Sequence, residues 1–247
     1  LEGAKRMIYF VGAGSGAPDL ITVRGQRLLQ TAGLVIYAGS LVNPELLALC
    51  PTRCVCMNSA AMTLAEIVSA MAESDCEVVV RLHTGDPCLF GAVREQMDAL
   101  QARSIPFENV PGVSSFCAAA AALHAEYTLP GVSQTVIISR MAGRTPVPER
   151  ESIRSLAAHQ ATMVLFLSAS MLDALCGELI AGGYPADTPS ALVYKASWPE
   201  ETVIRGTLAS LPELGAAYTK TALVVVGGCL GDDYQLSRLY DASFSHA

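Results

Sequence analysis

Short aliphatic runs alternate along the chain with stretches whose apolar residues recur at helical spacing. In the first half, the runs that predict strands are Ile8–Val11, Leu34–Tyr37, Cys54–Met57, Glu77–Leu82 and Pro106–Asn109. The amphipathic stretches between them, which predict helices, lie near Val23–Ala32, Leu64–Glu73 and Val93–Arg103. This alternation is typical of a largely parallel sheet with helices on its faces.

A second series follows an alanine-rich run, Ala118–Ala122, which we expect to begin the crossover. Its predicted strands are Thr135–Ser139, Met163–Leu167, Ala191–Tyr194, Thr202–Arg205 and Leu223–Val226, and its predicted helices are Ile153–Ala158, Met171–Ala181 and Leu208–Ala216. We therefore predict the α/β class, with two α/β domains (residues 1–118 and 119–247) and mixed, largely parallel sheets. Because no low-complexity linker is visible, we expect tightly joined domains with a cleft between them.

The composition narrows the possible functions. Hydrophobic residues make up 51% of the 247 residues and charged residues 16%, which indicates a folded core. The net charge of −7 argues against nucleic acid as a partner, because duplex-binding proteins present a basic face. The most continuous apolar run, Phe116–Leu123, is about half as long as a bilayer requires, so we expect no membrane span. Since no apolar leader is visible, we expect a cytoplasmic protein.

Three of the eight cysteines, Cys50, Cys54 and Cys56, lie close together in the sequence. A metal site is one interpretation of this cluster. However, the chain has no CxxC pair, its histidines are scattered, and the spacing matches no zinc pattern. The sequence therefore favours free, mostly buried thiols in a reducing cytoplasm, and we predict no metal.

A glycine-rich loop, Gly12-Ala-Gly14-Ser-Gly16, follows the first predicted strand. Glycines let a backbone turn sharply and approach a ligand closely. A dinucleotide fingerprint requires its third glycine three places after the second, and an acid at the end of the second strand. Here the third glycine comes two places on, and Tyr37-Ala38-Gly39 carries no acid. The loop is either structural or faces a ligand other than a nucleotide, and the sequence favours neither.

Two further loops follow predicted strands of the first domain. Thr84-Gly85-Asp86-Pro87 stands at the carboxyl end of a strand, where parallel sheets place ligands. Asp86 either accepts hydrogen bonds from a ligand or stabilises an ordinary turn, and the pattern alone somewhat favours the turn. In Pro111-Gly112-Val113-Ser114-Ser115, Ser114 either caps the alanine-rich helix or offers its hydroxyl to a ligand, and capping is the safer interpretation.

In the second domain, the loop from Arg140 to Pro148 also carries Arg144 and is stiffened by prolines. Charged loops are usually just solvated, but guanidinium groups pair with carboxylates through two hydrogen bonds. The stiffness of this loop tilts the interpretation modestly toward an anion contact. Tyr194–Pro199 contains Trp198, the only tryptophan, which either stacks on a flat ligand or packs at the domain junction. No nucleophile–base pair or paired-carboxylate motif stands out, so no catalytic residue is assigned.

Taken together and in this order, the motifs resemble the tetrapyrrole (corrin and porphyrin) methylase family from about Ile8 to Gly231. The segments that carry the resemblance are VGAGSGAPDLIT (Val11–Thr22), RLHTGDPCLFG (Arg81–Gly91) and VPGVSSFCAAAAA (Val110–Ala122). Four others are most similar to members that methylate carbon 11 of precorrin-4, with or without cobalt: YAGSLV (Tyr37–Val42), SRMAGRTPVPE (Ser139–Glu149), YKASWPEE (Tyr194–Glu201) and SRLYDASFSH (Ser237–His246). Ala38 stands where uroporphyrinogen methyltransferases carry Asp, which counts against that substrate.

The resemblance implies a homodimeric enzyme of cobalamin biosynthesis that uses S-adenosylmethionine, held in the cleft between the domains, and releases S-adenosylhomocysteine. By motif, the cofactor contacts fall on Thr84, Gly85, Asp86, Leu89, Ser114, Ser115, Leu167 and Ala196. The implied substrate is a polycarboxylated tetrapyrrole, so we expect a local basic lining on this acidic chain. The residues predicted to contact it are Gly14, Ser15, Arg140, Arg144 and Lys195. Ser15 replaces the usual proline of the family's glycine loop, which puts the stiffness of that loop in doubt.

Other functions stay open at this point. The chain could methylate another ring position, or another target such as a diphthine precursor or RNA, although the acidic charge and the arginine loop disfavour RNA. It could also hold a tetrapyrrole without turnover, but such a carrier has no need of the cofactor motif at Thr84–Pro87. Within the resemblance, Gly85-Asp86-Pro87 and the stretch from Arg144 to Pro148 are more similar to the cobalt-dependent, anaerobic branch.

Overall fold

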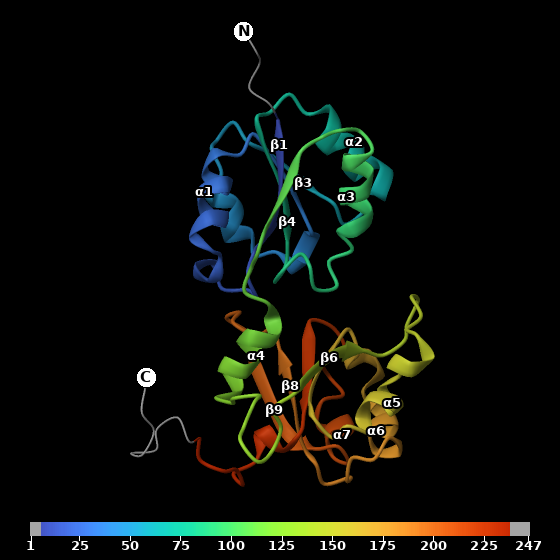
Figure 1. Cartoon of the computed structure of the whole chain (residues 1–247). Coiled ribbons are helices and arrows are strands. Elements are labelled where there is room, and N and C mark those ends of the chain that lie inside the picture. Colours follow the sequence, from blue (N-terminus) through green and yellow to red (C-terminus); the bar gives the residue numbers. More distant parts are fainter. Residues whose placement is uncertain (1–5, 238–247) are drawn as a thin grey trace, which may run out of the picture. The chain divides into compact units, whose positions relative to one another are not determined.

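The computed structural model describes residues 6–237. The chain divides into two compact units (Figure 1). The first unit comprises Leu1–Ala118 together with Ser197–Pro199, and the second comprises Ala119–Ala196 and Glu200–Ala247. The tail motif that starts at Ser237 lies, beyond that residue, outside the described part. Within residues 6–237, no helix is long and apolar enough to cross a membrane.

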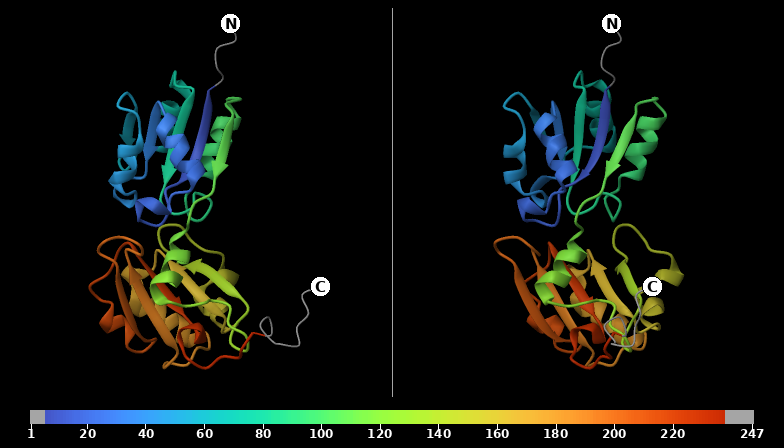
Figure 2. Two further views of the ribbon diagram at one scale, coloured as in Figure 1. Left: turned by 90° about the vertical axis from the view of Figure 1, so that its left-hand side faces the viewer. Right: turned by 60° about the vertical axis from the view of Figure 1, so that its left-hand side comes forward.

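A parallel sheet forms the centre of the first unit. Its strands are β1 (Met7–Gly12), β2 (Leu34–Tyr37), β3 (Val55–Asn58), β4 (Val78–His83) and β5 (Phe107–Val110), in the spatial order β3-β2-β4-β1-β5. The helices are α1 (Val23–Thr31), α2 (Leu64–Glu73) and α3 (Arg94–Gln101), with short 3-10 turns η1 (Pro18–Leu20), η2 (Gly39–Leu41) and η3 (Pro44–Leu49). Figures 1 and 2 show α1 on one face of this sheet and α2 and α3 on the other.

Alternate residues of the central strands serve two separate cores. Ile8, Phe10 and Ile36 pack against α2 and α3, whereas Val11 and Val35 pack against α1 and η3. Since side chains alternate across a strand, a run of aliphatic residues fills both faces at once. This explains why the strands of this unit are continuous apolar runs.

Local signals start the helices that cover the sheet. The Thr22 hydroxyl accepts a hydrogen bond from the Gly25 N–H at the start of α1. Thr63 and Glu66 form a reciprocal capping box at the start of α2. Each cap satisfies backbone N–H groups that have no partner within the helix, which fixes where the helix begins.

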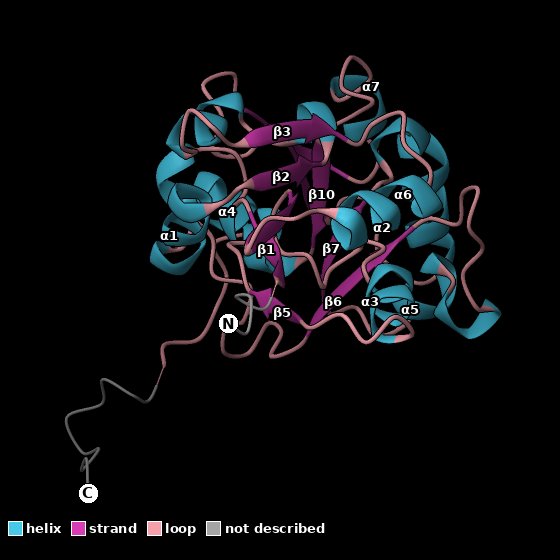
Figure 3. Ribbon diagram, turned by 90° about the horizontal axis from the view of Figure 1, so that it is seen from above, coloured by secondary structure: helices cyan, strands magenta, loops and turns pink. Residues whose placement is uncertain are grey.

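A mixed sheet forms the centre of the second unit. Its strands are β6 (Val136–Arg140), β7 (Thr162–Phe166), β8 (Pro189–Tyr194), β9 (Thr202–Thr207) and β10 (Ala222–Val226), in the spatial order β6-β7-β10-β8-β9. Its helices are α4 (Ser115–Leu123), which starts in the first unit, α5 (Ile153–Ala157), α6 (Leu172–Ala181) and α7 (Leu211–Leu214), with 3-10 turns η4 (Glu149–Glu151), η5 (Ala169–Met171) and η6 (Gly228–Leu230). Seen from above, α5 and α6 lie beside β6 and β7 (Figure 3).

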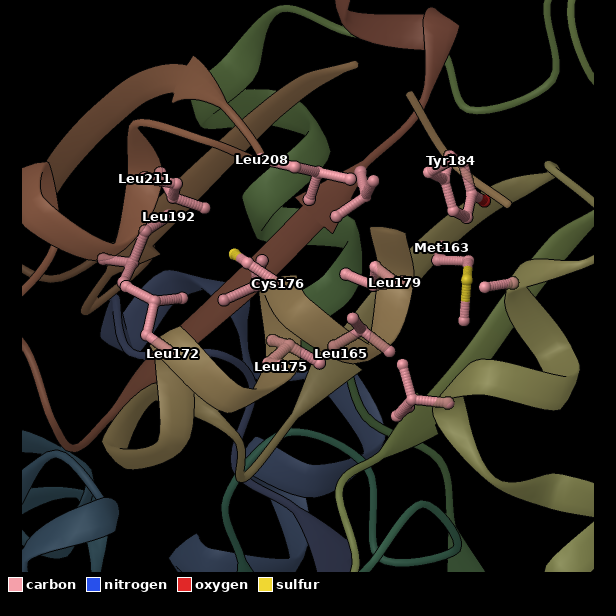
Figure 4. Close-up of a cluster of buried hydrophobic side chains, with 14 of the residues drawn as sticks. Met163, Leu165, Leu172, Leu175, Cys176, Leu179, Tyr184, Leu192, Leu208 and Leu211 are labelled. Atoms are coloured by element: carbon pink, nitrogen blue, oxygen red, sulfur yellow. The ribbon is translucent and has the colours of Figure 1, made fainter. Parts of the chain in front are cut away.

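One core fills the space between this sheet and its outer helices. Leu165 of β7, Leu175 of α6 and Leu192 of β8 are all fully buried there. Figure 4 shows these side chains with Met163, Tyr184 and Leu211 around them. Each unit therefore has a hydrophobic core of its own.

The α/β class and both series of strands are confirmed, with strand boundaries displaced by at most two residues. Predominantly parallel pairing holds for the first sheet. In the second sheet, only β6 and β7 pair in parallel, because β8 and β9 form an antiparallel pair across a short connection and β10 lies antiparallel between β7 and β8. The helix predicted over Leu208–Ala216 is shorter, since the segment before it forms a Thr207–Ser210 turn.

Candidate functional site

Three loops leave the carboxyl ends of adjacent strands in the first unit. They follow β1, β4 and β5, and they carry the glycine loop, the Thr84–Pro87 turn and the Pro111–Ser115 segment. Because the strands are parallel, these ends lie at one edge of the sheet, which is where α/β proteins place ligands.

Glycines let the three loops meet through their backbones. A Cβ on Gly12 or on Gly112 would come closer than 3.0 Å to the Gly85 carbonyl oxygen, a separation that real Cβ atoms essentially never show. Gly14 and Gly85 exchange backbone hydrogen bonds of 2.7 and 3.4 Å, and both have left-handed φ values, of 82° and 61°. The glycine loop thus has a structural function, and contact of Gly14 and Ser15 with a substrate stays a prediction.

Asp86 links two of these loops through its carboxylate. One oxygen accepts a hydrogen bond of 2.8 Å from the Cys88 N–H in its own turn. The other accepts a hydrogen bond of 2.9 Å from the Gly112 N–H on the next loop. Asp86 therefore stabilises its turn, as the sequence pattern alone favours, and also fixes a second loop beside it.

The residues predicted to hold the cofactor in the first unit surround Gly85. The position of a Cβ on Gly85 lies 3.6 Å from the Ser115 nitrogen and 4.0 Å from the Ser114 hydroxyl oxygen. Thr84 is half-buried beside it, and Leu89 closes the same turn, with its N–H donating to the Asp86 carbonyl. A glycine backbone beside hydroxyl and backbone N–H groups suits a polar, zwitterionic ligand such as S-adenosylmethionine.

Ser197–Pro199 covers the glycine loop within the first unit. The Trp198 indole N–H donates to the Ser15 carbonyl at 3.1 Å, and its ring occupies the space that a Cβ on Gly16 would need. The hydroxyl groups of Ser15 and Ser197 lie 2.8 Å apart, and Ser15 is only 5% exposed. These contacts hold Ser15 in place on the glycine loop.

The second unit gathers its predicted site residues at one edge of its own sheet. β6 and β7 are parallel, and β8 runs in the same direction because both β7 and β8 are antiparallel to β10. Arg140, Leu167 and Ala196 therefore lie at or just beyond the carboxyl ends of three strands. Ser168 joins two of these ends, since its hydroxyl accepts a 2.8 Å hydrogen bond from the Met141 N–H.

Backbone strain marks this edge. Leu167 has a φ of 52° and is 67% exposed, and Lys195 has a φ of 47°. Left-handed backbone costs about 1–3 kcal/mol at a residue with a side chain and is concentrated at ligand-binding sites. Because Leu167 is exposed, packing in the core does not explain its left-handed backbone.

The three basic candidates differ in their surroundings. Arg140 donates to the carbonyl oxygens of Met141, Thr145 and Pro146 at 3.0–3.1 Å, so its guanidinium shapes the arginine loop. Lys195 forms an ion pair with Glu200, with a nitrogen–oxygen distance of 3.0 Å. Arg144 is exposed and forms no ion pair with any residue of the described part. Arg144 is thus the basic group most available to a carboxylate.

Two buried polar residues of β4, His83 and Arg81, were not singled out from the sequence as site residues. His83 ends β4 and is 4% exposed, and its Nε2 has no hydrogen-bond partner among the described residues. Burial, with a smaller contribution from Arg81, lowers the pKa of His83 to about 3, so the imidazole is neutral at ordinary pH. Arg81 donates to Gln96 and to the Ile36 carbonyl. The sequence did offer a signal for these two residues, because Arg81 and His83 interrupt the apolar run of β4.

The loops that follow these parallel strands, with their glycine contacts and the Gly-Asp-Pro turn, define a family. The chain belongs to the Tetrapyrrole (Corrin/Porphyrin) Methylases, whose family model matches residues 7–212. A cobalt-precorrin-4 C(11)-methyltransferase from Methanocaldococcus jannaschii is 50% identical over 246 residues, which cover 98% of this chain and 95% of that protein. A precorrin-4 C(11)-methyltransferase from Mycobacterium tuberculosis is 46% identical, over 96% of each protein. The resemblance predicted from the motifs is confirmed.

Solved structures agree with this placement. The X-ray structure of a cobalt precorrin-4 methyltransferase, described as a cobalamin biosynthetic enzyme, matches with a TM-score of 0.90 and 43% identity over 94% of this chain and 99% of that one. A uroporphyrin-III C-methyltransferase from Thermus thermophilus, complexed with S-adenosyl homocysteine, matches with a TM-score of 0.76 and 27% identity over 91% of this chain and 93% of that one.

Proposed function

We propose that this chain methylates carbon 11 of precorrin-4 or cobalt-precorrin-4 in cobalamin biosynthesis, with S-adenosylmethionine as methyl donor. The observation that carries the proposal is the 50% identity to a relative with this activity over 98% of the chain. The glycine contacts and the Asp86 links show that the loops typical of the family are assembled in this chain. The enzyme is thus an S-adenosylmethionine-dependent C-methyltransferase.

The cofactor contacts proposed for the first unit are Thr84, Gly85, Asp86, Leu89, Ser114 and Ser115, and those for the second unit are Leu167 and Ala196. When bound, S-adenosylmethionine supplies an electrophilic methyl group to a ring carbon and leaves as S-adenosylhomocysteine. The protein orients the two reactants and excludes water, which is the main requirement of an in-line displacement. The Asp86 carboxylate contributes by keeping the Gly85 backbone and the Gly112 loop in fixed positions.

Binding of the polycarboxylated substrate falls to local basic groups, because the chain carries a net charge of −7. Arg144 is the principal candidate, since it is exposed and unpaired within the described residues. Arg140 supports it indirectly by holding the carbonyl groups of the loop on which Arg144 stands. Lys195 reaches a substrate carboxylate only by leaving Glu200. Gly14 and Ser15 are proposed as further substrate contacts.

We propose that the enzyme acts in the cytoplasm as a homodimer and prefers the cobalt-containing substrate. The preference rests on the Gly85-Asp86-Pro87 turn and on the stretch from Arg144 to Pro148, and the dimer rests on the family resemblance alone. Light scattering of the purified chain tests the dimer, and a mass of one chain at micromolar concentration contradicts it.

A methyl-transfer assay tests the function. The purified chain is incubated with S-adenosylmethionine and precorrin-4, in separate metal-free and cobalt-containing forms, and the products are analysed by mass spectrometry and NMR. We expect a gain of one methyl group at carbon 11, absent when S-adenosylmethionine is omitted. Methylation at another carbon would assign a different ring position. Tetrapyrrole binding without any methyl gain would contradict the enzyme and favour a carrier.

A further inference from the structure

The cysteine cluster at the amino-terminal end of β3 has a geometry that the sequence does not show. The Sγ atoms of Cys50, Cys54 and Cys56 all lie within 4.8 Å of one another, and none of them forms a disulfide. Among the described residues, no histidine or carboxylate joins this group. Three neighbouring thiol groups therefore form a ligand set made only of sulfur, which suits thiophilic metal ions.

The backbone holds these thiols in place. Cys50 ends η3, where its N–H donates to the Leu47 carbonyl, and the next turn closes with a 2.8 Å hydrogen bond from the Cys54 N–H to the Pro51 carbonyl. Cys56 lies two residues further along, in register with Val35 of β2. Since side chains repeat every second residue in extended chain, Cys54 and Cys56 point to the same side.

The spacing suits a tetrahedral thiolate site. Zinc binds thiolate sulfur at about 2.3 Å, which places two sulfur ligands of one tetrahedral ion about 3.8 Å apart. Sulfur atoms within 4.8 Å therefore reach this geometry through small side-chain rotations. Cys56 is exposed while Cys50 and Cys54 are half-buried, so the three thiols form an open triangle whose fourth position faces solvent.

We propose that Cys50, Cys54 and Cys56 form a binding site for a thiophilic divalent cation such as Zn²⁺, with a water molecule or an external ligand in the fourth position. This replaces the expectation of free thiols drawn from the sequence. The site lies toward the amino-terminal end of β3, whereas the loops of the methylase site follow the carboxyl ends of β1, β4 and β5. The cation accordingly stabilises η3 and the edge strand and takes no part in methyl transfer.

The test uses the full-length, reduced chain, freed of metal and titrated with Zn²⁺ against a competing chelator. We expect one Zn²⁺ per chain, protection of three thiols from a thiol-reactive dye, and three sulfur neighbours around zinc in its X-ray absorption spectrum. Cys56→Ser should lower the Zn²⁺ affinity by roughly 100-fold or more, because it removes a direct ligand. Cys56 is exposed on an edge strand, so this variant should fold normally.

Cys76→Ser serves as the matched control, because Cys76 lies in the same unit but outside the cluster. It should bind Zn²⁺ as the unsubstituted chain does. Equal Zn²⁺ binding by the Cys56→Ser chain, binding through fewer than three sulfur atoms, or no binding at all would overturn the proposal. If dissolved oxygen, once the reductant is removed, oxidises two of the three thiols to a disulfide even with Zn²⁺ present, the proposal would be overturned as well and a redox pair indicated. Methyl-transfer activity is not a readout here, so failure leaves the proposed enzyme function unaffected.

Discussion

Asp86 has a carboxylate with two backbone partners, on two different loops. Asp86→Ala removes both hydrogen bonds and frees the Gly112 loop from the Gly85 turn. Each hydrogen bond to a charged group contributes about 1.5–3 kcal/mol, so we expect S-adenosylmethionine affinity to fall by at least about tenfold. Isothermal titration with S-adenosylhomocysteine measures the change.

The matched control for this substitution is Asp98→Ala. Asp98 forms an exposed ion pair with Arg94 one turn away in α3 and touches neither loop. Exposed pairs contribute about 0.2–1 kcal/mol, so this variant should bind like the unsubstituted chain. Equal affinities of the two variants would show that the Asp86 links are unimportant for the cofactor.

Arg144 is predicted to act on the substrate alone. Arg144→Ala should weaken tetrapyrrole binding by about 1–3 kcal/mol, because it removes a charged hydrogen-bond donor from a carboxylate, and leave S-adenosylhomocysteine binding unchanged. Fluorescence titration with the substrate and calorimetry with S-adenosylhomocysteine separate the two effects. Arg150→Ala, which removes an exposed arginine already paired with Glu151, should change neither. Parallel losses of both ligands in Arg144→Ala would contradict the assignment.

His83 should make the stability of the protein depend on pH. Its pKa is about 3 in the folded chain against an ordinary value of 6.5, so between these values the unfolded chain binds a proton that the folded chain does not. Stability should therefore fall as the pH drops below about 6.5, by about 1.4 kcal/mol per pH unit from this group. Urea unfolding of His83→Gln should show a correspondingly flatter profile, whereas exposed His159→Gln should match the unsubstituted chain. Equal dependence of stability on pH in the unsubstituted chain, His83→Gln and His159→Gln would contradict the role assigned to His83.

The sequence motifs predicted which loops carry the candidate site residues, but they did not predict the hydrogen-bond partners of those residues. Thr84 to Asp86 and Ser114 could be assigned to neighbouring loops because the carboxyl ends of parallel strands meet at one edge. The partners of Asp86 and Arg140 could not be predicted, since they are main-chain groups of Gly112 and Thr145 that the fold places. A side chain that binds backbone has no complementary residue in the sequence to reveal it.

At the scale of elements, the loops after β1, β4 and β5 depend on glycines at their junction. Gly112→Ala should strongly destabilise the first unit and abolish cofactor binding, because its Cβ would collide with the Gly85 carbonyl oxygen and with Gly12. Gly143→Ala is the control, since nothing lies within 4 Å of a Cβ at that position. Thermal unfolding with and without S-adenosylhomocysteine measures both. A Gly112→Ala protein with unchanged melting and ligand response would contradict the packing described.

Periodicity predicted the strands well and their pairing less well. Met163 to Leu165 and Leu223 to Val226 are short apolar runs, which indicate a buried strand in either direction. The antiparallel direction of β10 is set by where the chain re-enters the sheet, between β7 and β8, and this is a property of the connections. The length of α7 is set by the Thr207–Ser210 turn, whose hydrogen bonds compete with a longer helix.

At the scale of the whole molecule, each unit has its own hydrophobic core. A substitution in one core should therefore destabilise that unit and leave the other unchanged. Leu175→Ala opens a cavity in the core of the second unit and should cost about 2–5 kcal/mol there. Hydrogen exchange should accelerate in β7, β8 and β10, while β1 and β4 keep their protection. Leu236→Ala, at an 84% exposed position, is the control and should change neither. Equal acceleration in both units would show that they unfold as one.

The contact between Trp198 and the glycine loop also affects when that loop is completed during synthesis of the chain. Ser15 and Trp198, which meet in the first unit, are 183 residues apart in the chain. At about 5–20 residues per second, the ribosome delivers Trp198 roughly 10–40 seconds after Ser15. Once Val110 has been made, the nascent first unit contains all five strands of its sheet and both glycines of its Gly14–Gly85 bridge, but it lacks the indole ring over Gly16. The glycine loop is thus covered only after all the residues between Ser15 and Trp198 have been made.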